Sequence, residues 1–233
     1  MTVRLDRCMT QLVLGTALAI HLVGCGGAGS FGEKVSVAPE KKVTLESPFA
    51  QGQPMYFPKD RPFNVTDAQR TSSGGGSAES WAKEAGTALC KASADSPGKA
   101  TAEFQIGQVL DTRSAKPVDV TAVFDLDYQY SVKSDPNDVT KPEDTLALKV
   151  YISDSNRHVL KRTVLTDVQS ASAPENFAGR QKPSFDVTLE PGVAYHFVVA
   201  GLVEVTGTEK SGASAGIEIR SFELELLPRN TQR

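Results

Sequence analysis

The feature that most constrains the fold is an unbroken two-residue alternation over residues 118–133. Every even-numbered position, from Val118 to Val132, is apolar or aromatic, and every odd-numbered position except Val123 is polar. Successive side chains of a β-strand point to opposite faces, whereas an α-helix repeats every 3.6 residues. The pattern therefore predicts a long strand with one face buried and the other in solvent.

The same alternation recurs downstream and predicts five further strands, at 145–153, 158–168, 184–189, 193–205 and 215–227. In the last of these the apolar positions run to Ile219 and then resume one residue out of phase at Phe222. An extra residue in one strand of a pair is what a β-bulge supplies. The phase slip therefore predicts a bulge at Arg220–Ser221.

The region before residue 118 is less regular. Small or apolar side chains alternate over 88–94 and 100–106, on either side of the turn-forming sequence at 95–98, which predicts a hairpin that turns there. Cys90 falls on the inward face of that hairpin, where a thiol behaves as a small hydrophobe. Upstream, the composition of "TSSGGGS" (71–77) predicts a linker or long loop, and "SAESWAKEAG" (77–86) predicts a short helix or turn.

The N-terminus has the layout of a secretory signal, because Arg4 and Arg7 precede a short apolar run over residues 9–23. This run is shorter than the roughly 20 residues that a membrane-spanning helix needs. It ends in "LVGC" (22–25), which resembles the lipobox of bacterial lipoproteins. The resemblance implies that Cys25 becomes the lipidated N-terminus, carrying acyl chains such as palmitate. Gly26, where inner-membrane lipoproteins carry Asp, implies the outer membrane or cell surface.

These patterns together predict an all-β protein. About eight strands with one-sided alternation and no helical core element are typical of an antiparallel β-sandwich, here of jelly-roll-like character. We expect a signal peptide at 1–24, a flexible tether and Pro/Gly-rich leader at 25–77, and the β-sandwich domain at 78–233. Pieces of the leader, at 34–37 and 41–46, could add strands to the sheet.

Charge and motif content argue against several functions. The formal net charge of −3 is opposite to that of a nucleic-acid-binding surface. "GASAG" (212–216) matches the Gly-x-Ser-x-Gly nucleophile elbow, but a strand follows it and no Asp or His lies downstream. Asp125 and Asp127 share one face about 7 Å apart, within the range of an inverting glycosidase pair. Surface strands often carry two aspartates, so we expect no enzymatic activity.

A cofactor is not required by any motif. The acidic loop 134–144 offers oxygen ligands suited to calcium, which takes six to eight of them. The candidate ligands are Asp135, Asn137, Asp138 and Asp144. Their spacing is not that of an EF-hand, and the alternative is a solvated connecting loop.

The region 86–227 resembles, in architecture, the β-sandwich carbohydrate-binding modules of bacterial surface proteins. The resemblance implies binding of a glycan or cell-envelope polysaccharide through solvent-facing aromatic rings, with Trp81 and Tyr151 as candidates. Tyr151 is out of phase with the apolar face of its strand, and the alternative is that it packs against the leader or a second layer. The competing hypothesis is a structural or assembly lipoprotein, whose Pro-rich segment 38–62 lies along a protein partner of the envelope.

Overall fold

The computed structural model describes residues 43–44, 52–112, 114, 116–134, 144–169, 176–209 and 212–229. Within these ranges the chain forms strands joined by turns and short loops and no helix, so none of the described elements is a helix long and apolar enough to cross a membrane. The strands are β1 (Val43–Thr44), β2 (Met55–Phe57), β3 (Val65–Lys83), β4 (Thr87–Asp111), β5 (Val118–Ser134), β6 (Thr145–Asp154), β7 (Val159–Gln169), β8 (Asn176–Gln181), β9 (Ser184–Leu189), β10 (Ala194–Gly207) and β11 (Ala213–Pro228). The predicted antiparallel all-β sandwich is confirmed.

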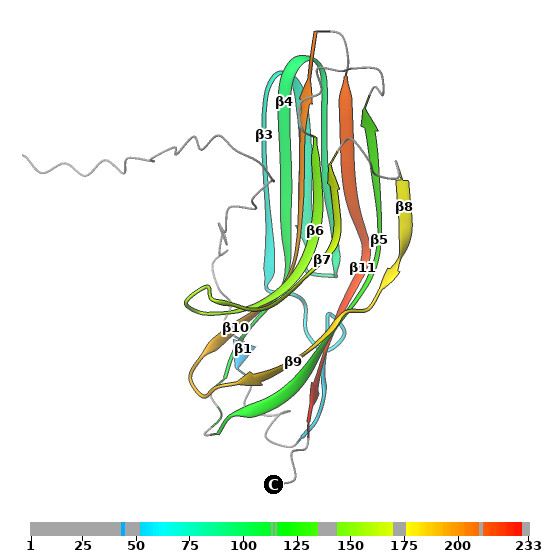
Figure 1. Ribbon diagram of the computed structural model, residues 1–233. Coiled ribbons are helices and arrows are strands. Elements are labelled where there is room, and N and C mark those ends of the chain that lie inside the picture. Colours follow the sequence, from blue (N-terminus) through cyan, green and yellow to red (C-terminus); the bar gives the residue numbers. More distant parts are fainter. Residues whose placement is uncertain are drawn as a thin grey trace, which may run out of the picture. The chain divides into compact units, whose positions relative to one another are not determined.

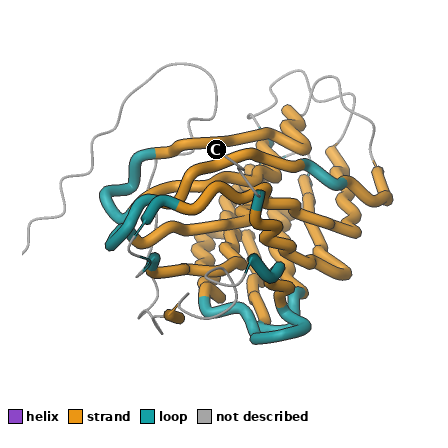
Figure 2. Tube along the Cα trace, turned by 90° about the horizontal axis from the view of Figure 1, so that it is seen from below, coloured by secondary structure: helices purple, strands orange, loops and turns teal. Residues whose placement is uncertain are grey.

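The strands form two packed layers, seen from the side in Figure 1 and from below in Figure 2. The first layer has the order β7-β6-β10-β4-β3, and the second has the order β3-β4-β11-β5-β8. In the second layer, β9 also pairs with β5, and β2 pairs with β11. Strands β3 and β4 belong to both layers and so connect them.

The connection is a long two-stranded ribbon that bends in the middle. β3 pairs with β4 along its whole length, from Val65 opposite Gly107 to Lys83 opposite Thr87. Residues 98–111 of β4 pair with β10, whereas residues 88–94 pair with β11. Figure 1 shows the ribbon arching over at the top of the sandwich. The two halves of β4 therefore lie in opposite layers and face each other across the core.

This ribbon corrects three predictions. The chain does bend at 95–98, but the two halves of β4 do not form a hairpin, because both pair with β3 and the hairpin turn lies at Glu84–Gly86. Residues 71–77 are neither a linker nor a long loop, because all of them belong to β3. Of the expected helix or turn at 77–86, residues 77–83 belong to β3 and only 84–86 form a turn. The glycines are needed for the bend: Gly74 has φ +61°, and a Cβ there would lie 2.2 Å from the carbonyl oxygen of Pro97.

The ribbon also bears on the expected domain boundary. β3 runs without a break across residues 77 and 78, where the leader was expected to end. Further upstream, β2 pairs with β11, with Met55 opposite Leu226. The sandwich therefore includes residues upstream of 78.

Six of the remaining strands lie close to where the alternation predicts them, whereas β2 and β8 were not predicted. β5, β6, β7, β9, β10 and β11 match the predicted ranges to within two residues at each end. The register between β11 and β5 shifts between Ile219 and Ser221, which confirms the predicted bulge. β1 falls within the expected strand at 41–46 and pairs in parallel with β4 at Leu110. The expected strand at 34–37 lies outside the described residues.

The space between the layers is filled by the inward positions of the strands. Phe222 stacks between Phe63 and Phe124, with ring centroids 4.6 and 5.9 Å away and interplanar angles of 5°. Cys90 is fully buried among small side chains, and this burial raises the pKa of its thiol far above the usual range. The thiol therefore stays protonated at neutral pH and packs as an apolar group, as predicted.

Candidate functional site

The outer face of the second layer carries two adjoining depressions, of about 410 and 330 Å³. Both are lined by Lys91, Ser131 and Gly216. Strand pairing places these residues in one row, which continues to Asn176 on β8. The surface is depressed at the centre of this row because Gly216 has no side chain. The Lys91 side chain lies close by, since a Cβ on Gly216 would be 2.9 Å from its Cγ. Small residues flanked by long polar ones thus create the hollow.

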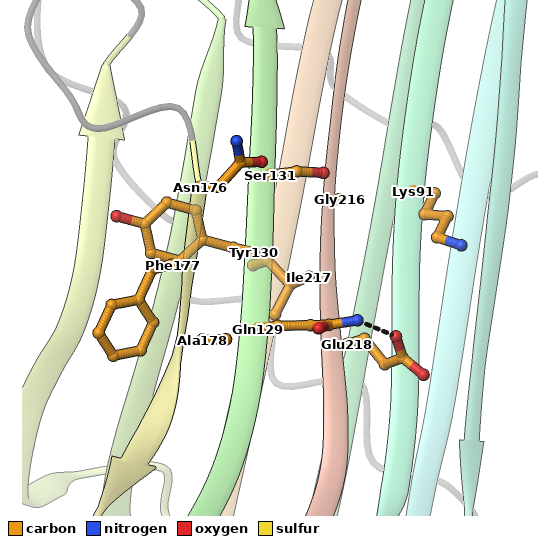
Figure 3. A pocket seen from close by; sticks show the side chains of 10 residues that line it. All are labelled: Lys91, Gln129, Tyr130, Ser131, Asn176, Phe177, Ala178, Gly216, Ile217 and Glu218. Carbon is orange, nitrogen blue, oxygen red and sulfur yellow. Dashed lines mark hydrogen bonds between the residues drawn. The ribbon is translucent and has the colours of Figure 1, made fainter.

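The neighbouring row forms one wall of the hollow. Glu218 on β11 stands opposite Gln129 on β5, which stands opposite Ala178 on β8. The Nε2 atom of Gln129 donates a hydrogen bond to Oε2 of Glu218 at 2.7 Å, drawn as the dashed line in Figure 3. Because one carboxylate oxygen and the amide oxygen are not used by this bond, the pair can still accept hydrogen bonds from a ligand.

The second depression extends the hollow toward β3 through small hydroxyl side chains. Its lining includes Ser77, Ser93 and Ser214, and the hydroxyls of Ser77 and Ser93 lie 3.0 Å apart. Glu79 stands opposite Lys91 and lines this second depression. The whole face therefore offers hydroxyl, amide, carboxylate and ammonium groups along a direction that crosses the strands.

Trp81, one of the two sequence candidates, lies on this same face. It pairs with Leu89 on β4, and Leu89 pairs with Glu218 on β11. Adjacent strands are spaced by about 4.8 Å, so the tryptophan backbone lies roughly 10 Å from that of Glu218. The indole is partly exposed, and Nζ of Lys83 lies 4.6 Å from its ring centroid. Trp81 lines neither depression, and strand register places it on β3, at the edge of the face that carries them.

Two further aromatic residues line the opposite side, at β8. The rings of Tyr130 and Phe177 stack with centroids 5.6 Å apart, and Phe177 also contacts Tyr128 at 5.1 Å. Figure 3 shows both rings beside β5, away from Lys91. These rings pack mainly on the core, so their contribution to the hollow is its apolar edge.

Tyr151, the other candidate, lies in the first layer. Its side chain points away from the main core and clusters with Val198 and Ala200 on the outer face. It is only 5% exposed, and its hydroxyl donates to Oε1 of Gln105 at 3.4 Å. The two candidates therefore do not come together, and Tyr151 presents no open ring face. Ligand binding by either residue stays a prediction.

The paired aspartates of β5 are engaged in ion pairs below the hollow. Nη2 of Arg180 donates to Asp125 at 2.8 Å, Nζ of Lys182 lies 3.3 Å from the same carboxylate, and Asp127 pairs with Arg220. The hydrogen bond from Arg180 lowers the pKa of Asp125, although burial opposes the shift. An inverting glycosidase needs one of its two carboxyls protonated. Asp125, held in its ionised form by Arg180, is therefore not suited to be the general acid of that mechanism.

The candidate calcium ligands fall largely outside the described residues, which exclude Asp135, Asn137 and Asp138. Asp144 is buried and accepts a hydrogen bond from the backbone N–H of Thr206 at 3.0 Å. In the part of the chain that the structure describes, no group of three or more His, Cys, Asp or Glu residues is placed to hold a metal ion. Calcium binding stays a prediction, as does lipidation of Cys25, which also lies outside these ranges.

Comparison with known proteins gives structural likenesses alone. No family model and no curated protein matches the chain. A bacteriophage CBA120 tailspike protein 4 enzymatically active domain shares 11% identity over 70% of this chain and 19% of its own, with a TM-score of 0.29. A carbohydrate-binding module of the β-sandwich superfamily shares 8% identity, over 69% and 56% of the two chains, with a TM-score of 0.27.

The module TmCBM61, in complex with β-1,4-galactotriose, is 12% identical over 77% of this chain and 95% of its own, again with a TM-score of 0.27. At such TM-scores these likenesses carry no argument about the ligand of this chain. Any functional interpretation therefore depends on its own side chains.

Sequence reasoning missed Lys91, Gln129 and Glu218. Each is a single polar residue at an outward position of a different strand, and nothing in the local sequence marks it. The register of the three strands β4, β11 and β5 brings them into adjacent rows. The one usable signal is the "GASAG" segment, whose small residues leave the outer face of β11 low at Gly216.

Proposed function

We propose that this chain is an exported lipoprotein whose β-sandwich is a non-catalytic binding domain for a glycan, such as a cell-envelope polysaccharide. The observation that carries the proposal is the hollow on the second layer. A floor of small residues at Gly216 and Ser131 is bounded by the Gln129–Glu218 pair and by Lys91, in register with the partly exposed ring of Trp81.

The chemistry of this face suits a sugar. A pyranose offers hydroxyls that both donate and accept hydrogen bonds, and an apolar C–H face that can lie against an aromatic ring. The hollow supplies carboxylate and amide acceptors, hydroxyls and an ammonium donor. Because its two parts adjoin across β3, β4, β11, β5 and β8, the binding direction crosses the strands and accommodates several units of an extended chain.

The proposed anchor complements this binding mode. Lipidation of Cys25 would attach the chain to the outer membrane or cell surface, because two or more acyl chains give stable anchoring. The sequence "GGAGSFG" (26–32) that follows is Gly-rich, a composition typical of flexible tethers. A tethered binding domain of this kind holds a polysaccharide close to the membrane that carries it.

The test is retention of the chain on a panel of soluble and insoluble polysaccharides, with Cys25→Ala in every protein to keep it free of lipid. Glu218→Ala removes an acceptor from the hollow and should weaken binding to the retained glycan about tenfold or more. Glu223→Ala is the matched control, since Glu223 is exposed on the same strand but does not line either depression.

Equal affinity of the two variants would contradict the assignment of the site. Absence of retention on every glycan would contradict the proposed function and favour the alternative, an assembly lipoprotein with a protein partner. Crosslinking in the intact envelope would then be the way to find that partner.

A further inference from the structure

The hairpin formed by β6 and β7 combines features that the glycan site does not use. Three large apolar side chains of the described chain are exposed, and all lie on β7: Val159 at 38%, Leu160 at 42% and Val164 at 51%. The hairpin projects from the body of the sandwich at the lower left of Figure 1. Apolar side chains gathered at one projecting edge mark a contact surface more often than scattered ones do.

The same segment is cationic. Arg157, Lys161 and Arg162 are exposed, and no carboxylate occurs between residues 155 and 166. The flanking acid Asp154 accepts hydrogen bonds from within the turn, and Asp167 lies farther along β7. Because the whole chain carries a net charge of −3, this positive charge is a local feature and not a reflection of overall composition.

Strand register places part of this chemistry on one face. Val159, Arg162 and Val164 stand opposite Ser153, Tyr151 and Lys149. Tyr151 points to the outer face of the first layer, so these partners on β7 do so as well. The outer face of the hairpin thus alternates apolar and basic side chains.

The turn that joins the two strands is held in a fixed conformation. The carboxylate of Asp154 accepts hydrogen bonds from the backbone N–H groups of Asn156 and His158 at 2.8 and 2.9 Å. Arg157 adopts φ +65°, a region that few non-glycine residues occupy. These bonds present Arg157 at the tip of the hairpin.

Pairing with another strand does not account for the exposed apolar residues. The register between β6 and β7 shifts twice, between Leu148 and Lys149 and between Ile152 and Ser153, and each shift leaves an extra residue on β7. Bulges and lysines at an edge strand oppose strand addition. A second copy of this chain would also bring the same cations together.

We propose that the β6–β7 hairpin, from Arg157 to Val164, binds an anionic lipid surface. The basic side chains would contact lipid phosphates, while Val159, Leu160 and Val164 would enter the boundary between headgroups and acyl chains. That the hairpin lies near a membrane in the cell rests on the proposed lipid anchor. The affinity of the hairpin for anionic lipid does not depend on the anchor. With the anchor, it would be a second attachment that orients the sandwich on the membrane.

The test is co-sedimentation of the unlipidated full chain, carrying Cys25→Ala, with two kinds of vesicle: phosphatidylcholine alone, and phosphatidylcholine with about one third phosphatidylglycerol, a fraction chosen to give a strongly anionic surface. We expect binding to the anionic vesicles alone, weakened by salt. Each basic residue near the surface contributes about fivefold. Lys161 stands opposite the inward-pointing Ile152 and so lies on the other face of the hairpin. R157Q/K161Q/R162Q together should therefore reduce binding about 25-fold, through Arg157 and Arg162.

The control is K99Q/K116Q/K133Q, three exposed lysines on other parts of the molecule with the same loss of charge. Leu160→Ser with Val164→Ser should also weaken binding. The proposal is overturned if the unlipidated chain ignores anionic vesicles, or if the control triple reduces binding as much. It is also overturned if sedimentation velocity shows that the chain forms a dimer and that Leu160→Ser abolishes this dimer. Glycan retention, measured on the same proteins, reports separately on the proposed function.

Discussion

The outer faces of the two layers have the same backbone architecture and opposite chemistry. In the first layer, the outer face has a covered apolar patch, where Val198 is 1% exposed and packs with Tyr151 and Ala200. In the second layer, the corresponding positions carry polar side chains around a hollow centred on Gly216. Alternation along a strand thus separates inward from outward positions, but it does not tell whether the outward face is covered or open.

The largest expected difference between the faces comes from introducing a charge on each. Val198→Asp places an unpaired carboxylate at a covered position and should lower the free energy of unfolding by about 3–5 kcal/mol. Ser131→Asp, at an exposed position of the second layer, should change it by less than about 0.5 kcal/mol. Urea denaturation of the two variants measures both values, and equal losses would contradict the distinction between the faces.

A smaller effect tests the hollow itself. Gly216→Leu places a large side chain at the bottom of the hollow, and the side chain of Lys91 must shift to make room for it. The substitution should weaken glycan affinity about tenfold. Its melting temperature should stay close to that of the parent, because the atom it meets belongs to a flexible side chain. Ser73→Leu adds the same kind of bulk at an exposed strand position that lines neither depression, and should bind as the parent does.

The smallest expected effect concerns the ion pairs that border the hollow. Because Arg180 lowers the pKa of Asp125 in the folded state, the carboxylate stabilises the fold above its unfolded pKa, about 3.9. That contribution is lost as the pH falls through the lower folded-state value. Asp125→Asn should therefore cost about 1 kcal/mol at neutral pH, a figure reduced by the solvent exposure of Arg180 and Lys182, and less in strong acid.

Denaturation at neutral and acidic pH checks this, with Asp127→Asn as the comparison. The Asp127 side chain is 36% exposed and that of Asp125 is 7% exposed, so the loss of the Asp127–Arg220 pair should cost less. If Asp125→Asn costs as much in strong acid as at neutral pH, the carboxylate is not the stabilising group.

The fold could be predicted from the sequence wherever one face of a strand is buried. Residues 118–133 and the five downstream segments alternate for that reason. The change of phase in the apolar pattern near Arg220 coincides with the bulge. β3 could not be found, because its Gly-rich middle is determined by a contact distant in sequence: the bend brings Gly74 against Pro97. Locally, such a segment has the composition of a linker.

The site was less predictable. Trp81 could be singled out as the one tryptophan of the sequence, outside the most regular strands, and the structure places it on the hollowed face. Lys91, Gln129 and Glu218 could not be, because their proximity depends on the register of strands far apart in sequence. Tyr151 illustrates the converse: its phase correctly predicts that it points away from the core, but the phase does not show that it is covered.

Glycan affinity of Trp81→Ala and Tyr151→Ala, measured side by side on the unlipidated chain, tests the central claim most directly. If the site lies on the second layer, Trp81→Ala weakens binding by about tenfold with little loss of stability, as for loss of one aromatic contact. Tyr151→Ala should lower stability by roughly 2–4 kcal/mol because a buried ring is removed, and leave affinity unchanged while the protein is folded. Weaker binding in Tyr151→Ala with parent-like binding in Trp81→Ala would place the site on the first layer and contradict the account.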